Sequence, residues 1–204
     1  MHVGPTIRRN LLMTNDNAEV LVERFWESEL LDSTEEFILS GHKDGYRFSG
    51  RTLILHDGIR VEIDYLVEAR PDWSTRSASV SIPALATVFE VNVSQARRWV
   101  IDGEHRGELN GCVDIDLGWT PATNTLPIRR LRLARGVPRT TRVAWLKWSE
   151  LVFMPADQTY TRRGEGIFTY SSGDFTADLH VDEEGVVVTY GQPPIWQELR
   201  AAER

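Results

Sequence analysis

Apolar and polar residues alternate with a period of two along most of this 204-residue chain. In residues 59–67 every second position is apolar, and Arg60, Glu62 and Asp64 lie between these positions. Residues 174–182 repeat the pattern. Successive side chains of a strand point to opposite faces of a sheet, so this alternation predicts strands with one buried face. Half-buried strands are typical of antiparallel sheets.

Turn signals separate many short segments of this kind, for example the Asp-Gly pairs at 44–45, 57–58 and 102–103. Further strands are predicted at 20–28, 34–41, 45–56, 74–82, 84–92, 94–102, 112–117, 141–148, 150–154, 157–163, 166–171 and 185–190. Short strands at this spacing predict an all-β fold, either a sandwich, a barrel or a roll. The length predicts a single domain, placed at residues 18–197, with a flexible extension at 1–17 and a tail at 198–204.

Residues 141–148, TRVAWLKW, are apolar on both faces of the predicted strand. Such a strand requires a packing partner on each side, either a helix inside a curved sheet or a second subunit. The best helix candidate spans residues 120–130, where Thr120 is a suitable N-cap and Pro121 suits the first helical position. Pro127 limits this helix because the residue before a proline disfavours the helical conformation. We expect a short or kinked helix, followed by a hairpin from 131–133 into 141–148.

Composition and motifs exclude several classes of function. The formal net charge of −7 argues against binding to nucleic acid or to an anionic membrane. Cys112 is the only cysteine, which excludes an internal disulfide and a cysteine-based zinc site. No histidine pair has metal-ligand spacing, and no nucleotide, hydrolase or zinc-protease motif is present, so no metal, cofactor or catalytic residue is predicted. No apolar run suits a signal peptide or a membrane span, and a cytoplasmic location is expected.

Residues 109–133 concentrate the polar chemistry of the chain. Asp114 and Asp116 lie on the same face of one predicted strand. They are candidates for an acid/base pair or for half of a cation site. Alternatively, they form ion pairs with Arg129, Arg130 or Arg132, which follow within one short connection. This structural interpretation is favoured because buried charges are usually paired and arginine binds a carboxylate with two hydrogen bonds.

Other side chains are candidates for ligand binding. Thr123 and Asn124 offer a hydroxyl and an amide to a sugar or another head group, although capping and turn formation are the commoner roles of such residues. Trp73 and Trp119 lie beside turns, where an indole ring is able to stack on a sugar, whereas most tryptophans are core residues. The arginines between 129 and 142 are able to face an anionic ligand or to form a solvated surface with ion pairs.

Residues 109–131, LNGCVDIDLGWTPATNTLPIRRL, resemble the core motif of a bacterial glycolipid-binding family, formerly a domain of unknown function. Matching segments in the family's order extend the resemblance over residues 24–197. They are DWSTRSASV at 72–80, RRWVIDG at 97–103, VAWLKW at 143–148, QTYTRR at 158–163 and VDEEGVVVTY at 181–190. Asn110 departs from the pattern, in which aspartate is usual. The resemblance implies a many-stranded antiparallel spiral β-roll wrapped around a single short helix, and a homodimer, but no catalytic residues.

Three hypotheses about function follow. The first is a non-catalytic protein that binds an amphiphilic or glycolipid-like molecule in a cavity between sheet and helix. The cavity would hold the tail, and the residues expected at the ligand are Asp114, Asp116, Trp119, Thr123, Asn124, Arg129, Arg130 and Trp73. The second hypothesis is a hydrolase or isomerase that uses Asp114 and Asp116. The third is a dimeric scaffold with no small ligand.

Overall fold

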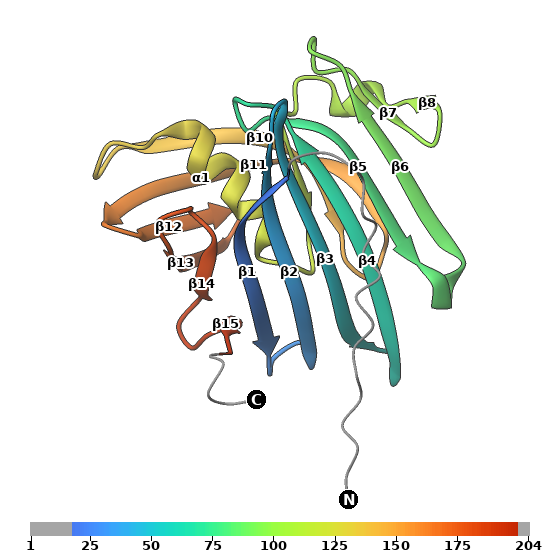
Figure 1. Ribbon diagram of the computed structural model, residues 1–204, viewed down its shortest axis with the longest axis horizontal. Coiled ribbons are helices and arrows are strands. Elements are labelled where there is room, and N and C mark those ends of the chain that lie inside the picture. The colour runs from blue at the N-terminus through green and yellow to red at the C-terminus, as the bar shows by residue number, and fades with distance from the viewer. Residues whose placement is uncertain (1–17, 200–204) are drawn as a thin grey trace, which may run out of the picture.

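The computed structural model describes residues 18–199, which form one sheet of fifteen strands. The strands are β1 (Glu19–Ser28), β2 (Ser33–His42), β3 (Gly45–His56), β4 (Ile59–Ala69), β5 (Thr75–Ile82), β6 (Thr87–Val93), β7 (Trp99–Ile101), β8 (Glu104–His105), β9 (Asp114–Leu117), β10 (Pro138–Lys147), β11 (Val152–Gly164), β12 (Ile167–Ser172), β13 (Phe175–Val181), β14 (Val187–Tyr190) and β15 (Trp196–Glu198). The helices are α1 (Thr125–Leu131) and the single 3-10 turns η1 (Pro83–Leu85), η2 (Gly107–Leu109) and η3 (Ala122–Asn124). The predicted mostly β architecture with one short α-helix is confirmed (Figure 1).

Sequential hairpins build this open sheet in two runs, β8 to β1 and β15 to β10, which join where β1 pairs with β15. The Asp57-Gly58 turn between β3 and β4 has φ of 49° and 77°, the positive values that a type I′ hairpin requires. One edge strand, β9, pairs with β10 in parallel. The sheet is therefore mixed but largely antiparallel, in agreement with the predicted antiparallel architecture.

The edge strand β9 lies against the start of β5, which is far from it in the strand order. The Thr75 N–H donates to the Val113 carbonyl at 3.2 Å, and the Thr75 hydroxyl accepts a hydrogen bond from the Ile115 N–H at 2.8 Å. The sheet therefore curves until its β9 edge returns to β5. Figure 1 shows α1 within this curve.

Two apolar clusters form the core. The larger one gathers inward-facing side chains of most strands, including Trp26, Phe37 and Trp99, all of which are fully buried. The smaller cluster surrounds α1 and consists of Ile128, Leu133, Tyr160, Phe168, Tyr170 and Leu179. Because α1 contributes Leu126 to the larger cluster and Ile128 to the smaller one, the short helix ties the two together.

The strand β10 is apolar on both faces, as its sequence predicts. Ala144 and Leu146 are buried in the larger cluster. Val143 and Trp145 lie on the other face, in register with Asp114 and Asp116 of β9. This second face is turned toward α1, since Arg130 of the helix reaches Asp114. A helix inside the curved sheet is therefore the packing partner of that face.

The helix begins later than the sequence predicts. The Thr120 hydroxyl accepts a hydrogen bond from the Ala122 N–H at 3.0 Å, but the N-cap residues are Pro121 for η3 and Asn124 for α1. Thr120 therefore caps neither element. Pro127 is the third residue of α1 and does not end it, because the first turn of a helix needs no N–H donor there. The predicted hairpin from 131–133 is wrong. Leu131 ends α1, and the backbone of Arg132 has a left-handed conformation. The strand β10 pairs instead with β9 and β11.

The predicted chain ends lie mostly outside the described residues. The extension at 1–17 and residues 200–204 are not among them. Glu198, which the sequence assigns to the tail, belongs to β15 and pairs with Trp26 of β1. Within residues 18–199, no helix is long and apolar enough to cross a membrane.

Candidate functional site

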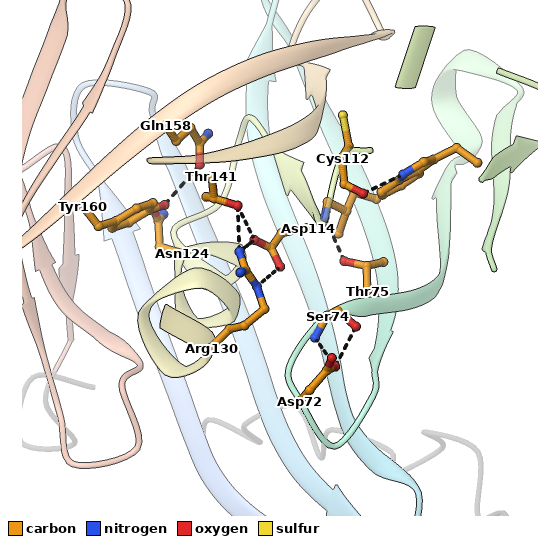
Figure 2. A network of polar contacts seen from close by, with 12 residues as sticks. Asp72, Ser74, Thr75, Cys112, Asp114, Asn124, Arg130, Thr141, Gln158 and Tyr160 are labelled. Atoms are coloured by element: carbon orange, nitrogen blue, oxygen red, sulfur yellow. Dashed lines mark hydrogen bonds and ion pairs between the residues drawn. The ribbon is translucent and has the colours of Figure 1, made fainter. Parts of the chain in front are cut away.

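Asp114 forms a buried ion pair with Arg130. Its carboxylate is fully buried and accepts two hydrogen bonds from Arg130, one of them from Nε at 3.0 Å (Figure 2). The Arg130 guanidinium also donates to the Thr141 hydroxyl at 2.7 Å. Burial raises the pKa of Asp114, and the hydrogen bonds from Arg130 oppose that rise. This pair ties α1 to β9, as the structural interpretation of the sequence predicts.

Asp116, two residues further along β9, has no arginine partner among the described residues. Its Oδ2 accepts a hydrogen bond of 2.6 Å from Gln158 Nε2 on β11, and its Oδ1 accepts one of 3.2 Å from the Thr123 hydroxyl. Burial raises the pKa of this carboxyl from 3.8 to about 6. Neutral donors compensate a buried charge less well than a guanidinium does, which explains why the two aspartates differ.

Asp116 opens into a pocket of about 510 Å³, hereafter the Asp116 pocket. Its lining residues are Leu30, Leu31, Asp116, Leu117, Gly118, Thr120, Pro121, Asn124, Trp145, Gln158, Tyr170, Ser172, Gly173, Phe175, Tyr190, Ile195 and Trp196. The volume falls within the range of small-molecule sites, which is about 300–1,000 Å³. Aromatic walls with a few convergent polar groups are the usual composition of such sites.

The buried side chains that line the Asp116 pocket are both polar and apolar, whereas its most exposed side chains are apolar. Gln158 and Asn124 are buried, and Tyr160 links them by donating to Asn124 Oδ1 at 2.9 Å (Figure 2). Leu30 and Phe175, by contrast, are 71% and 44% exposed. Its buried hydrogen-bonding side chains are therefore less accessible than its outermost apolar ones.

A second buried carboxylate lies behind the wall of this pocket. Glu35 on β2 accepts hydrogen bonds at Oε1 from the Tyr65 hydroxyl and, at 2.7 Å, from the hydroxyl of the lining residue Thr120. Its Oε2 has no hydrogen-bond partner within residues 18–199. Burial raises the pKa of Glu35 from 4.5 to about 7. Tyr65 reaches Glu35 by lying over Gly50, where a Cβ would be 2.3 Å from the ring.

Trp73 and Arg129 line a different hollow, of about 850 Å³, hereafter the Arg162 pocket. It lies at the C-terminal half of α1, and its lining residues are Tyr46, Pro71, Trp73, Ile128, Arg129, Arg132, Leu133, Arg162, Glu165, Gly166, Phe168, Val181, Asp182, Glu183 and Gly185. The Trp73 indole stacks on Tyr46 with ring centroids 3.6 Å apart, and the Arg129 guanidinium lies 5.0 Å above it. Trp73 therefore offers a ligand little more than its edge.

The structure divides the expected ligand residues among four settings. Asp116 and Asn124 line the Asp116 pocket, and Thr123 lies just behind it. Trp73 and Arg129 line the Arg162 pocket, whereas Asp114 and Arg130 bind each other. Trp119 is fully buried in the larger cluster, with its ring edge-on to Trp148. The geometry thus gives Trp119, Asp114 and Arg130 structural roles.

Sequence analysis missed Gln158 and Glu35. Glu35 carries a readable signal, because it lies in phase with Phe37 and Leu39 on the buried face of β2. Gln158 carries a weaker one, its position two residues before Tyr160 on the inner face of β11.

No group of three or more metal-ligating side chains occurs in the described part of the chain. Cys112 is buried, and burial raises the pKa of its thiol, which suits a core residue better than a nucleophile.

Comparisons with known proteins agree with this architecture. A family model described as "Putative glycolipid-binding" matches residues 23–197. A crystal structure of a DUF1089 family protein from Pseudomonas aeruginosa is 31% identical, with a TM-score of 0.70, and the match covers 82% of this chain and 92% of that one. No curated protein matches the chain. Because the family model spans most of its length, the chain belongs to the family described as "Putative glycolipid-binding".

Proposed function

We propose that the protein binds a small amphiphile whose hydroxyl-rich head group lies at the bottom of the Asp116 pocket. One observation carries this proposal: a carboxylate held only by neutral donors opens into an aromatic pocket of about 510 Å³. An ionised carboxylate offers about four acceptor positions, and the bonds from Gln158 and Thr123 use two of them. The remaining positions are suited to sugar hydroxyls.

Aromatic side chains supply the second half of the recognition. Trp145, Tyr170 and Tyr190 line the same pocket. Aromatic rings present large, rigid apolar surfaces against which the C–H faces of a sugar ring are able to pack. Family membership supports the same ligand class, because the family is described as "Putative glycolipid-binding".

The proposed orientation differs from the sequence hypothesis, which placed the tail inside the cavity. Gln158 and Asn124 of the Asp116 pocket are buried, whereas Leu30 and Phe175 of the same pocket are exposed. A head group that enters first satisfies the buried carboxylate, and its tail then lies along the apolar rim. The reverse orientation would leave Asp116 facing hydrocarbon, which is costly for an ionised group.

Titration with n-octyl β-D-glucoside below its micelle concentration tests this proposal by calorimetry. We expect the wild type to bind octyl glucoside and Gln158→Leu to bind it about tenfold more weakly. The substitution removes the side-chain amide that donates to the Asp116 carboxylate. Gln197→Leu is the matched control, because Gln197 also donates to a carboxylate, that of Glu27, but lies outside the pocket. Equal affinities of wild type and Gln158→Leu, or no binding at all, would overturn the proposal.

A second candidate function is acid–base chemistry on the bound head group. The Asp114/Asp116 pair does not support it, since Asp114 is held by Arg130, but Asp116 alone has a pKa of about 6 and faces the pocket. Hydrolysis of a panel of nitrophenyl glycosides and esters tests it. Turnover that disappears in Asp116→Asn would support catalysis, and turnover that persists in this variant would exclude Asp116 as the acid.

A further inference from the structure

We infer that the Arg162 pocket is a second, independent binding site, which takes an anionic oxygen group attached to a short apolar body. The pocket lies at the C-terminal half of α1, between the helix, the turn after β11 and the turn after β13. Three arginines line it: Arg129 of α1, Arg132 directly after the helix, and Arg162 near the end of β11. Neither Arg132 nor Arg162 forms an ion pair within residues 18–199.

The acidic residues of this pocket do not cancel its positive charge equally. Asp182 is already engaged, since its Oδ2 binds Arg24 and its Oδ1 accepts a hydrogen bond of 2.9 Å from the Val186 N–H. Glu165 and Glu183 are exposed, so water screens their carboxylates. Arg129 and Arg162 are half-buried. Asp182 is half-buried as well, but Arg24 neutralises it, whereas Arg162 has no acidic partner within residues 18–199.

The guanidinium groups retain free donors. Arg162 uses Nε on the Gly164 carbonyl at 3.0 Å, and its two terminal nitrogens have no hydrogen-bond partner among the described residues. Arg132 makes no side-chain hydrogen bond or ion pair within that same part of the chain. A planar guanidinium matches the geometry of a carboxylate or phosphate with two parallel hydrogen bonds. These free donors favour an oxyanion over a neutral hydroxyl group, because hydrogen bonds between two charged groups are the stronger ones.

Apolar side chains define the remainder of the ligand. Ile128, Leu133, Phe168 and Val181 line the same pocket, and the first three belong to the smaller apolar cluster. They provide contact surface for a short hydrocarbon or aromatic body next to the anionic group. Inorganic phosphate alone would leave this surface unused, so we expect it to bind more weakly than an alkyl phosphate.

The two pockets are separate. Phe168 lines the Arg162 pocket and Tyr170 lines the Asp116 pocket, and both lie on the inner face of β12 two residues apart. Both rings belong to the smaller cluster, which therefore lies between the hollows. Loss of binding in one pocket is not expected to abolish binding in the other.

Calorimetric titration with n-hexyl phosphate tests this inference. We expect wild-type binding that weakens with added salt, and about tenfold lower affinity in Arg132→Gln, which removes a charge without removing a side-chain contact. Arg162→Gln should lower the affinity similarly, with a thermal melt to verify that loss of the Gly164 contact leaves the fold intact. Arg139→Gln, an exposed arginine of β10 outside the pocket, is the matched control.

Two further comparisons separate this site from the Asp116 pocket. Gln158→Leu should leave hexyl phosphate binding unchanged, and Arg132→Gln should leave octyl glucoside binding unchanged. Absence of hexyl phosphate binding would overturn the inference, as would equal affinities of the wild type and Arg132→Gln. Loss of hexyl phosphate binding in Gln158→Leu would also overturn it, because that result would place the anion in the Asp116 pocket.

Discussion

Gln158 Nε2 on β11 donates a hydrogen bond of 2.6 Å to Asp116 Oδ2 on β9, across the intervening strand β10. Asp116 is thus held by a neutral donor and lines a pocket, whereas Asp114, on the same face of β9, forms an ion pair with Arg130. Asp114 and Asp116 thus have different roles, although both belong to one short strand. Asp114 holds α1 against the sheet, and Asp116 supplies the polar floor of the proposed binding site.

Arg130→Met should destabilise the fold strongly. The substitution leaves the fully buried Asp114 carboxylate without its charged partner, and removal of one partner of a buried ion pair costs about 3–5 kcal/mol. Urea unfolding at neutral pH measures the loss. Arg139→Met, at an exposed position of β10, should change the free energy of unfolding by no more than about 0.5 kcal/mol. Equal stabilities of the two variants would contradict the structural role of Asp114.

Glu35 should make the protein less stable as the pH rises from about 4.5 to about 7. The folded state holds the proton more tightly than the unfolded chain, because burial raises the pKa of Glu35 from 4.5 to about 7. The stabilisation that protonated Glu35 contributes is therefore fully present below the pKa of the unfolded chain, 4.5. It is lost as the pH rises through the pKa of the folded state, about 7. The loss due to this group is up to about 3 kcal/mol.

Urea unfolding of Glu35→Gln across this pH range isolates the effect. The difference in unfolding free energy between variant and wild type should move in favour of the variant as the pH rises. Glu36→Gln is the control, since Glu36 is the exposed neighbour of Glu35 on β2. Parallel pH profiles for wild type and Glu35→Gln would show that Glu35 is not buried as a protonated acid.

Gly50→Ala should destabilise the protein by about 1–3 kcal/mol, the usual cost of overpacking. The added Cβ would lie 2.3 Å from the Tyr65 ring and would displace the hydroxyl that donates to Glu35. Gly41→Ala on β2 is the control, because a Cβ there meets only Leu21 at 3.6 Å. Thermal unfolding compares the two. A Gly50→Ala protein as stable as Gly41→Ala would show that Tyr65 does not lie over Gly50.

Octyl glucoside affinity should rise between about pH 5 and about pH 7 in the wild type. Ionisation of Asp116, with its pKa of about 6, converts a neutral acid into a carboxylate that accepts stronger hydrogen bonds from hydroxyl groups. We expect a gain of about fivefold. In Asp116→Asn the affinity should not change over this range. A pH-independent affinity in the wild type would argue that the sugar does not contact Asp116.

Strands and turns could be read from the sequence because their cause is local. The alternation at 59–67 corresponds to β4, and the Asp57-Gly58 pair forms the expected turn. The region 120–131 was harder, because Thr120 and Pro127 are compatible with several helix starts. In the structure Thr120 precedes η3, and Pro127 lies in the first turn of α1. Such a choice depends on packing around the helix and not on local preference alone.

The candidate site was only partly predictable, because its partners come from distant strands. The motif around Asp114 and Asp116 located the region, and the resemblance identified the family, but neither showed that only Asp114 pairs with an arginine. Gln158 and Asp116 are 42 positions apart and meet because β9 pairs in parallel with β10. Trp119 follows a turn, as predicted, yet it is buried in the core and cannot stack on a ligand.

A crystal structure of the protein with bound n-octyl β-D-glucoside tests the central claim most directly. We expect the glucose ring at the bottom of the Asp116 pocket, within hydrogen-bond distance of Asp116 and Gln158, and the octyl chain against Leu30 and Phe175. An octyl chain at the bottom of the pocket, or a glucoside bound elsewhere while the pocket holds only water, would contradict it.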